Sequence, residues 1–172
     1  RSFSLLVRGD WGAGWDRFAY RWATPEMSRY RRRYAQPEWD GSDPAGLTIL
    51  VYPEQGFGDM LQFARFATQL ASLGANVILE APVPLVRLLS TLQGVQVVAS
   101  GAPLPEFHAH IAVMDLARHL GRDNDSIAMG NAYLSADRAQ VKRWKERLEG
   151  DGRYRVGIAW AGEPRPGQPS AA

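Results

Sequence analysis

The strongest constraint on the fold is a regular alternation of short apolar runs and amphipathic segments that begins at residue 47. Residues 47–52 form a continuous apolar run, typical of a strand buried on both faces of a parallel sheet. Residues 59–73 repeat apolar side chains at helical spacing, and Gly74 is expected at the C′ position of that helix. Further strands are predicted over 76–80, 95–99, 109–113 and 154–160, and further helices over 83–92 and 135–148. The alternation predicts an α/β fold with a Rossmann-like parallel sheet and helices on both faces.

The part of the chain before this alternation follows a helical pattern. Trp15, Phe18 and Trp22 recur at helical spacing, which predicts a helix–turn–helix segment over 1–34. Pro25 is expected to end the second of these helices. Residues 35–46 are rich in Pro, Gly and Asp, as turns are, and are interpreted as a linker to the α/β domain.

The C-terminal part is expected to add one helix and one strand and to end in a tail without regular structure. In the helix over 135–148, Val141, Trp144 and Leu148 mark the face expected to be buried. The strand over 154–160 precedes a Pro- and Gly-rich tail that is expected to fray. The predicted division is therefore a helical segment over 1–34, a linker over 35–46, an α/β domain over 47–150 and a last segment over 151–172.

Composition narrows the classes of function. The 172-residue chain has a formal net charge of +2, which does not indicate a nucleic-acid-binding protein, and the basic run 29–33 is interpreted as a solvated helix end. The chain has 0 cysteines, so no disulfide and no thiolate metal site can form, and His108 and His110 lack a third ligand nearby. No secretory leader and no apolar run long enough for a membrane span is present, and we expect a cytoplasmic protein.

The loop after the first strand carries the clearest functional signal. Ligands of parallel α/β sheets bind at the carboxyl ends of the strands, where this loop, residues 53–58, is expected. Gly56 and Gly58 allow a sharp turn and close approach of a ligand. Asp59 follows where a phosphate would otherwise dock on the helix N-terminus, and its carboxylate would repel one. The loop therefore favours a hydroxyl-bearing ligand over a phosphate.

The motif extends beyond its glycines to Gln62, Phe63 and Arg65. Related stretches occur elsewhere in the chain, at 39–41, 74–80, 88–95, 105–110, 133–134 and 156–162. Together they resemble the bacterial glycosyltransferases that carry TPR repeats and are related to the heptosyltransferases. The resemblance covers nearly the whole chain up to Gly162, after which the tail departs from the family pattern.

This resemblance implies a two-domain GT-B enzyme of which the chain is the N-terminal, acceptor-side half. Residues 1–34 would be the remnant of a TPR repeat, and residues 151–172 the first strand of a truncated donor-binding domain. Full-length enzymes of this kind transfer a sugar from a nucleotide-sugar donor to a hydroxyl of a protein or glycan acceptor, with inversion and without a metal or other cofactor. The chain alone is expected to be inactive, and surfaces that the missing parts would cover are expected to favour self-association.

The resemblance also assigns roles within the motif. Asp59 matches the catalytic base, which would accept a proton from the attacking hydroxyl. The remaining positions are predicted to bind substrate, namely Glu54, Gln55, Gly56, Gly58, Gln62 and Arg65.

Each role has a structural alternative. Asp59 and Gln62 also fit a capping box, as the N-cap and N3 residues of their helix. Glu54 and Gln55 fit hydrogen bonding within the loop, and Arg65 fits a solvated position. For the whole chain the alternative is a non-catalytic, TPR-linked interaction module. The observation that separates the two is whether Glu54, Gln55 and Asp59 converge on one open cleft.

Overall fold

The computed structural model describes residues 2–123, 132–149, 152 and 154–158. The chain divides into two compact units, Arg1–Asp137 and Arg138–Ala172, which are described separately below. None of the described helices is both long enough and apolar enough to cross a membrane.

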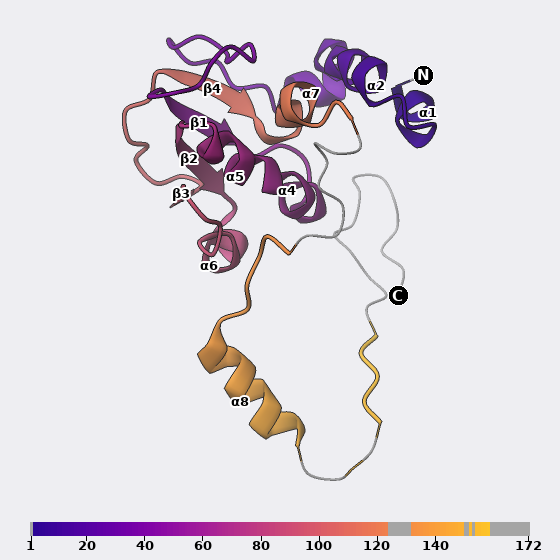
Figure 1. The fold of residues 1–172 in the computed structure, drawn as a ribbon, viewed down its shortest axis with the longest axis vertical. Helices are drawn as coiled ribbons and strands as arrows, with labels where there is room; N and C mark the ends of the chain where they lie inside the picture. Colours follow the sequence, from indigo (N-terminus) through magenta and orange to yellow (C-terminus); the bar gives the residue numbers. More distant parts are fainter. Residues whose placement is uncertain (1, 124–131, 150–151, 153, 159–172) are drawn as a thin grey trace. The chain divides into compact units, whose positions relative to one another are not determined.

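The first unit contains a four-stranded, all-parallel sheet with the order β3-β2-β1-β4 (Figure 1). Its strands are β1 (Thr48–Tyr52), β2 (Asn76–Ala81), β3 (Val95–Ala99) and β4 (Ala109–Ala112). In the centre, Leu50 of β1 pairs with Ile78 of β2 on one side and with His110 of β4 on the other. The chain runs outward from β1 to β3 and then returns to the other side of β1, so the topological switch point lies between β1 and β4. The predicted Rossmann-like α/β fold, a parallel sheet with helices packed on it, is confirmed. The helices cover one face, and an extended segment covers the other face, on which helices were also predicted.

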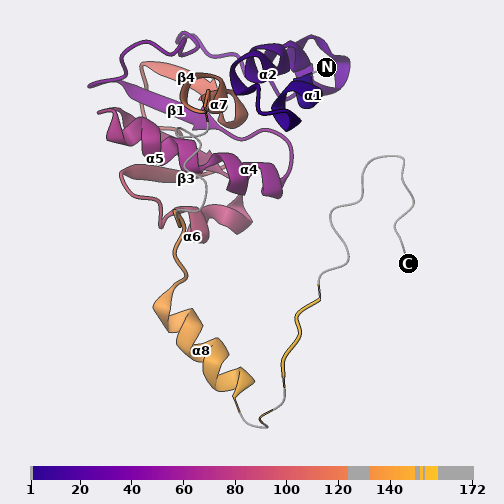
Figure 2. The same cartoon turned by 45° about the vertical axis from the view of Figure 1, so that its right-hand side comes forward.

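Helices cover one face of this sheet and enclose the core (Figures 1 and 2). Apolar side chains of alternate strand positions, such as Ile49, Val51 and Leu79, are buried with Met60 and Leu70 from the helices. The covering elements are α4 (Phe57–Phe63), α5 (Arg65–Ser72), the 3-10 turn η2 (Val83–Leu85), α6 (Val86–Leu89), the turn η3 (Val113–Asp115) and α7 (Leu116–Leu120). The helix predicted over 59–73 is therefore present as α4 and α5, joined at Ala64.

The opposite face of the sheet is covered by an extended segment. Tyr52 and His110 alternate onto this face, and the ring of Tyr34 packs edge-on against both, with centroids 6.3 and 4.9 Å away. Arg32 forms an ion pair with the buried carboxylate of Glu80 of β2. Residues before the predicted linker thus contribute to the α/β unit itself.

The predicted linker over 35–46 is also joined to the sheet. Glu38 forms a parallel bridge with His110, and the N–H of Trp39 donates to the His110 carbonyl at 2.9 Å. The Trp39 side chain is buried in the core. One large apolar residue therefore anchors a segment whose other residues are typical of turns.

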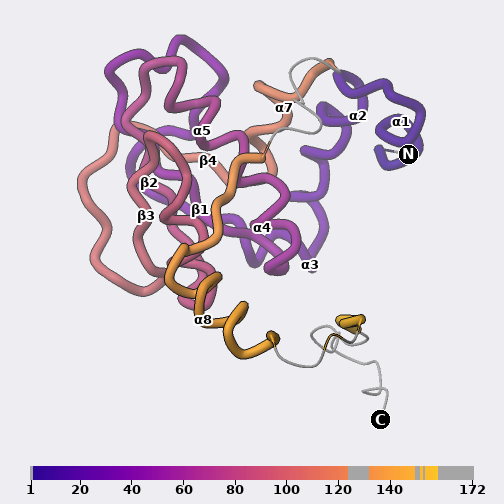
Figure 3. Tube along the Cα trace, turned by 60° about the horizontal axis from the view of Figure 1, so that its bottom comes forward, coloured from indigo at the N-terminus to yellow at the C-terminus, as the bar shows by residue number. Residues whose placement is uncertain are grey.

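The N-terminal segment folds as predicted into two helices joined by a turn. Its elements are α1 (Ser2–Val7), α2 (Trp11–Phe18), the 3-10 segment η1 (Ala19–Ala23) and α3 (Pro25–Ser28). The helical turns stop before Pro25, which then occupies the first turn of α3 behind the N-cap Thr24. α2 lies beside α7 of the α/β part (Figures 1 and 3), so the N-terminal segment packs within the same unit.

The second unit contains α8 (Arg138–Leu148), and two predictions for it are wrong. Val141, Trp144 and Leu148 are each about half exposed, at 52%, 52% and 47%, because no described element of this unit packs on that face of α8. Residues 154–158 form exposed coil, so the described part of the predicted strand over 154–160 is not a strand. A parallel strand needs a hydrogen-bonded neighbour, and the described residues pair none with it. Residues 159 and 160 lie outside the described part.

Two glycines of α2 test the packing of α1 on α2. A Cβ on Gly14 would lie 2.4 Å from Leu6 Cδ2 and 3.2 Å from the Leu6 backbone nitrogen, whereas a Cβ on Gly12 would meet the movable end of Arg122 at 3.2 Å. Both changes to alanine gain helix propensity of up to about 1 kcal/mol. We expect Gly12→Ala to leave the free energy of unfolding unchanged or to raise it, and Gly14→Ala to lower it by about 1–3 kcal/mol through overpacking.

Urea unfolding followed by circular dichroism measures both variants. Equal stabilisation by the two alanines would show that α1 does not pack on α2 as described.

Candidate functional site

The loop after β1 ends in a cap that starts α4. Gly56 is the N-cap residue and Asp59 is at N3, where its Oδ2 accepts the backbone N–H of Gly56 at 3.1 Å. The prediction that Asp59 is the N-cap and Gln62 is N3 is therefore wrong by three positions. The helix begins earlier because Phe57 and Gly58 already form its first turn, and the acid at N3 reaches back to the N-cap N–H.

Gln55 holds the most strained backbone in this loop. Its φ is +57°, and it is the non-glycine residue with positive φ in the part of the chain that the structure describes. Such a conformation costs of order 1 kcal/mol or more for a residue with a side chain. The exposed side chain of Gln55 reaches Met114 after β4, with Nε2 3.1 Å from Sδ. The strain therefore lies at the topological switch point between β1 and β4.

Glu54 faces inward, away from solvent. It is 2% exposed, and its two carboxylate oxygens accept Arg21 Nη2 at 2.7 Å and Arg21 Nε at 2.9 Å. The backbone N–H of Met114 donates to Oε1 at 3.2 Å. A carboxylate that is paired in this way and buried is not available to a substrate. Glu54 was predicted either to bind substrate or to form hydrogen bonds within the protein, and the structure shows the hydrogen bonds.

Arg21 bridges two buried carboxylates. Besides the bidentate pair with Glu54, its Nη1 lies 2.7 Å from Asp115 Oδ1, while Trp22 Nε1 donates to Asp115 Oδ2 at 2.9 Å. The guanidinium also stacks over Phe18 and Trp22, 4.5 and 4.2 Å from the ring centroids. Glu54 follows β1 and Asp115 follows β4, so Arg21 occupies the switch point where ligands of open α/β sheets usually bind.

Charge and burial act against each other in this cluster. Burial raises the pKa of Glu54, and the hydrogen bonds and charge of Arg21 oppose that rise. Burial also disfavours the charged form of Arg21, but its bonds to Glu54 and Asp115 outweigh burial and raise its pKa. The guanidinium stays protonated, and the cluster depends on it.

Asp59 and Gln62 face a pocket of about 360 Å³. Asp59 Oδ1 makes no hydrogen bond to any described residue, and Asp59 is partly exposed. Most of the wall is apolar and comes from the N-terminal helices; the lining residues are Phe3, Leu6, Val7, Trp11, Trp15, Phe18, Asp59, Gln62, Phe63 and Met114. The pocket thus brings together two predicted site residues, Asp59 and Gln62, but neither Glu54 nor Gln55. The convergence of Glu54, Gln55 and Asp59 on one open cleft, which the glycosyltransferase prediction expects, is therefore not observed among the described residues.

The other predicted site residues have structural surroundings of different kinds. A Cβ on Gly58 would meet nothing within 4 Å, so this glycine lies beside open space. Arg65 lies over the ring of Tyr133 at 4.7 Å, and the Tyr133 hydroxyl donates to the Leu61 carbonyl at 2.8 Å. No group of three or more metal-ligating side chains occurs among the residues described.

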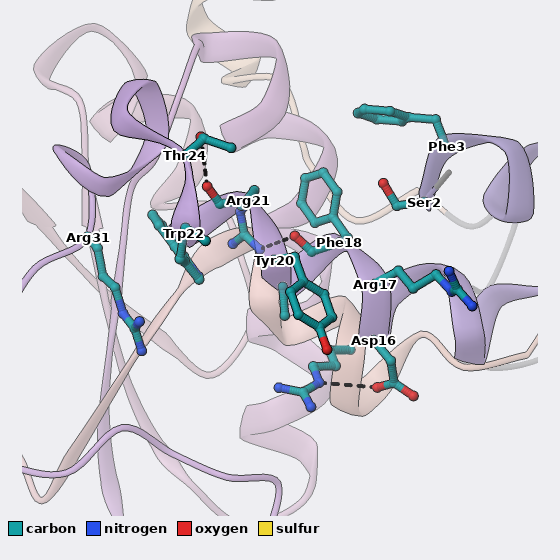
Figure 4. Close-up of a pocket in the computed structure, with 13 residues that line it drawn as sticks. Ser2, Phe3, Asp16, Arg17, Phe18, Tyr20, Arg21, Trp22, Thr24 and Arg31 are labelled. Atoms are coloured by element: carbon teal, nitrogen blue, oxygen red, sulfur yellow. Dashed lines mark hydrogen bonds and ion pairs between the residues drawn. The ribbon is translucent and has the colours of Figure 1, made fainter.

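A wider hollow of about 1060 Å³ adjoins the Asp59 pocket (Figure 4). It shares Phe3 and Phe18 with that pocket, and Figure 4 shows Arg21, Trp22 and Tyr20 along it. Sequence reasoning missed Arg21 and Asp115. The available signal was an arginine set among the regularly spaced aromatic residues of a predicted helix, which alone does not identify a partner.

Comparisons with known proteins give one distant similarity. No family model matches the chain, and no solved structure matches it. The chain is similar to Protein FlbA of Caulobacter vibrioides (strain ATCC 19089 / CIP 103742 / CB 15), with 29% identity over 181 residues that cover 93% of this chain. The matched region is 30% of the length of that protein.

Replacement of Arg21 tests the buried cluster. Arg21→Met leaves two buried carboxylates without their cation, and we expect a loss of about 3–5 kcal/mol in the free energy of unfolding. Arg31→Met is the matched control, since it breaks an ion pair with Glu38 in which the side chains are 46% and 36% exposed. We expect that control to cost less than about 1 kcal/mol.

The free energy lost in Arg21→Met is also expected to change with pH, whereas that lost in Arg31→Met is not. A carboxyl whose pKa is raised on folding favours the folded state when it is protonated, and this contribution is lost as pH rises through the folded pKa. Removal of Arg21 takes away the interaction that opposed the rise for Glu54. The deficit of Arg21→Met, measured by urea unfolding, should therefore shrink as pH falls from neutral toward 4.5, the ordinary value for Glu. If both variants lost the same free energy of unfolding at every pH, Arg21 would not be paired with buried carboxylates as described.

Proposed function

We propose that this chain is the acceptor-side half of an inverting, metal-independent glycosyltransferase that uses a nucleotide-sugar donor. The observation that carries the proposal is the position of Asp59. It stands at the start of α4, next to the carboxyl end of the central strand β1, with Oδ2 in the cap and Oδ1 uncommitted among described residues, facing a pocket with Gln62. The resemblance of the loop motif to TPR-linked glycosyltransferases supports the same proposal.

The chemistry needs one base and a defined orientation. The acceptor hydroxyl attacks the anomeric carbon, and a new C–O bond forms on one face of the donor sugar. On the opposite face the bond between the anomeric carbon and the nucleoside diphosphate breaks. Asp59 accepts the hydroxyl proton, and the nucleoside diphosphate leaves with the bonding electron pair. Gln62 presents an amide beside Asp59 that can donate to and accept from an acceptor hydroxyl. A second domain would hold the donor.

The buried cluster positions this loop. Arg21 fixes Glu54, the adjacent Gln55 takes its strained conformation against Met114, and the cap between Gly56 and Asp59 follows directly. In this proposal Glu54 and Gln55 are positioning residues, and Asp59 is the residue that touches the acceptor. A base that is held in place before the substrate arrives avoids the entropic cost of ordering it during the reaction.

The wall of the Asp59 pocket favours a second candidate, a non-catalytic interaction module. Phe3, Leu6, Val7, Trp11 and Trp15 supply an apolar surface, and Phe3 and Val7 are 68% and 88% exposed. An exposed apolar surface of this kind suits a protein partner better than a sugar. In this alternative Asp59 acts only as a helix cap.

Asp59→Asn in the full-length protein that carries this chain separates the two candidates. Asparagine keeps an acceptor oxygen for the Gly56 N–H but cannot take a proton at neutral pH. We expect sugar transfer to fall by about 10²–10⁴-fold, with donor binding and unfolding free energy nearly unchanged. The measurement is release of nucleotide from a panel of nucleotide sugars.

Asp43→Asn is the control, because Asp43 Oδ1 also accepts a backbone N–H, that of Ala45 at 3.0 Å, and Asp43 does not line the pocket. It should transfer at the wild-type rate. Transfer by Asp59→Asn at that rate would eliminate the base. Absence of transfer by the wild-type protein with every donor would favour the interaction module.

A further inference from the structure

The parallel sheet has two edges, and other described residues bond to the outer side of one of them. At β4, the His110 N–H donates to the Pro37 carbonyl at 3.0 Å, and the His110 carbonyl accepts the Trp39 N–H at 2.9 Å. β3 lies at the other end of the strand order and pairs with β2 (Figures 1 and 2). Among the residues described, no segment pairs with the outer side of β3. β3 is therefore the open edge of this sheet.

The register of β3 on β2 identifies the backbone groups at this edge. The Ser100 N–H donates to the Ala81 carbonyl at 2.8 Å, and the register places Ala99 opposite Ala81. The peptide groups of successive strand residues point to opposite sides of the strand, so those of Val95 and Val97 point away from β2. In the part of the chain that the structure describes, these groups of Val95 and Val97 have no hydrogen-bond partner. Their N–H and C=O groups are available to another strand.

β3 lacks the features that usually prevent one edge strand from pairing with another. Such edges are protected by charged side chains, by proline or by a β-bulge. The register of β3 with β2 is unbroken over the five residues of β3, so the strand has no bulge. β3 contains neither lysine nor proline, and the sequence from 88 to 105 contains no charged residue. In β3 itself, Gln96 is exposed and the other side chains are partly buried.

The side chains of β3 are suited to an identical strand. Three of its five residues are valine, and β-branched side chains form favourable cross-strand pairs. In an antiparallel pair of two copies centred on Val97, Val95 lies opposite Ala99, and Gln96 lies opposite Val98. No like charges face each other in this register, whereas a charged strand from another protein would find no counter-charge on β3.

We propose that the outer edge of β3 pairs antiparallel with the same edge of a second copy of this chain. At the centre, the Val97 N–H donates to the carbonyl of the partner's Val97 and the reverse bond also forms. Both copies use the same edge, so a two-fold axis relates them and the assembly closes as a dimer. The two four-stranded sheets then form one continuous sheet.

This surface differs from the one that the sequence predicts for self-association. That expectation concerns surfaces that missing parts of a longer protein would cover, whereas β3 is an edge of the described sheet itself. The pairing also does not depend on glycosyl transfer. Its failure would leave the assignment of Asp59 as a base untouched, and the reverse also holds.

Two variants at one position separate backbone pairing from side-chain packing. Val97→Pro removes the outward N–H, which proline tolerates on an edge strand because β2 does not use that group. Val97→Ala keeps the N–H and removes most of the side chain, so it is the matched control. We expect Val97→Pro to raise the dimer dissociation constant by more than about tenfold, since both central hydrogen bonds are lost. Val97→Ala should raise it by less than about fivefold.

The mass of the full 172-residue chain in solution measures this association. Light scattering from about 10 µM to 1 mM should show the wild type shifting from monomer to dimer, since interfaces of this small size are weak. Circular dichroism checks that both variants are folded.

Amide hydrogen exchange of the wild type tests the same edge without a variant, and it decides the question if Val97→Pro does not fold. We expect the Val97 amide to exchange about threefold or more slowly at 1 mM than at 50 µM, because the dimer gives it an acceptor. The amides of Gln96 and Val98 point toward β2 and are the internal controls. They should be protected to the same extent at both concentrations.

Three results would each overturn the proposal. The first is a wild-type mass that stays monomeric at 1 mM or grows beyond the dimer. The second is association of Val97→Pro as strong as that of Val97→Ala, which would place the contact on another surface. The third is exchange of the Val97 amide at the same rate at both concentrations.

Discussion

Arg21 joins the N-terminal helices to the sheet through two buried carboxylates, and the remaining geometry depends on that junction. A guanidinium without water is tolerated only when its hydrogen bonds are made, and Glu54 and Asp115 supply them from the ends of β1 and β4. The indole of Trp22 and the N–H of Met114 complete the bonding of the two carboxylates. The crevice that an open parallel sheet offers at its switch point is thus filled by the protein's own side chain.

Because Arg21 fills that crevice, the accessible pockets lie on two sides of the N-terminal helices. The Asp59 pocket lies against α1 and α2, and a second, half-open pocket lined by Trp22, Trp39 and Asp115 lies against η1. Both would lose a wall if the helices separated from the sheet. The N-terminal segment therefore forms part of the wall of both pockets, and its helices are positioned by charge pairing as well as by apolar packing.

The four strands of the sheet and most helices followed from local pattern, because an apolar run such as 47–52 is buried only between neighbouring strands. The site followed less well. Asp59 was predicted as the N-cap residue of its helix but lies at N3, since Gly56 and Asp59 can each start a helix and the choice depends on the turn before them. Glu54 was predicted to meet substrate, yet it is buried against an arginine 33 residues earlier in the chain. In α8, an amphipathic stripe predicted burial that no described partner provides.

By itself, the sequence determined the four strands of the sheet, most of the helices and the loop that ends the central strand, because these depend on the spacing of apolar residues and on glycine within short windows. It also determined, through the absence of cysteine, that no disulfide forms. Only the tertiary structure decided which charges are neutralised. Whether Glu54, Asp115 and Glu80 are free or paired depends on groups far away in the chain. The energy of a charge depends on its partners and its distance from water. For this reason the loop after β1 could be predicted from the sequence, whereas the cluster around Arg21 and the pockets could not.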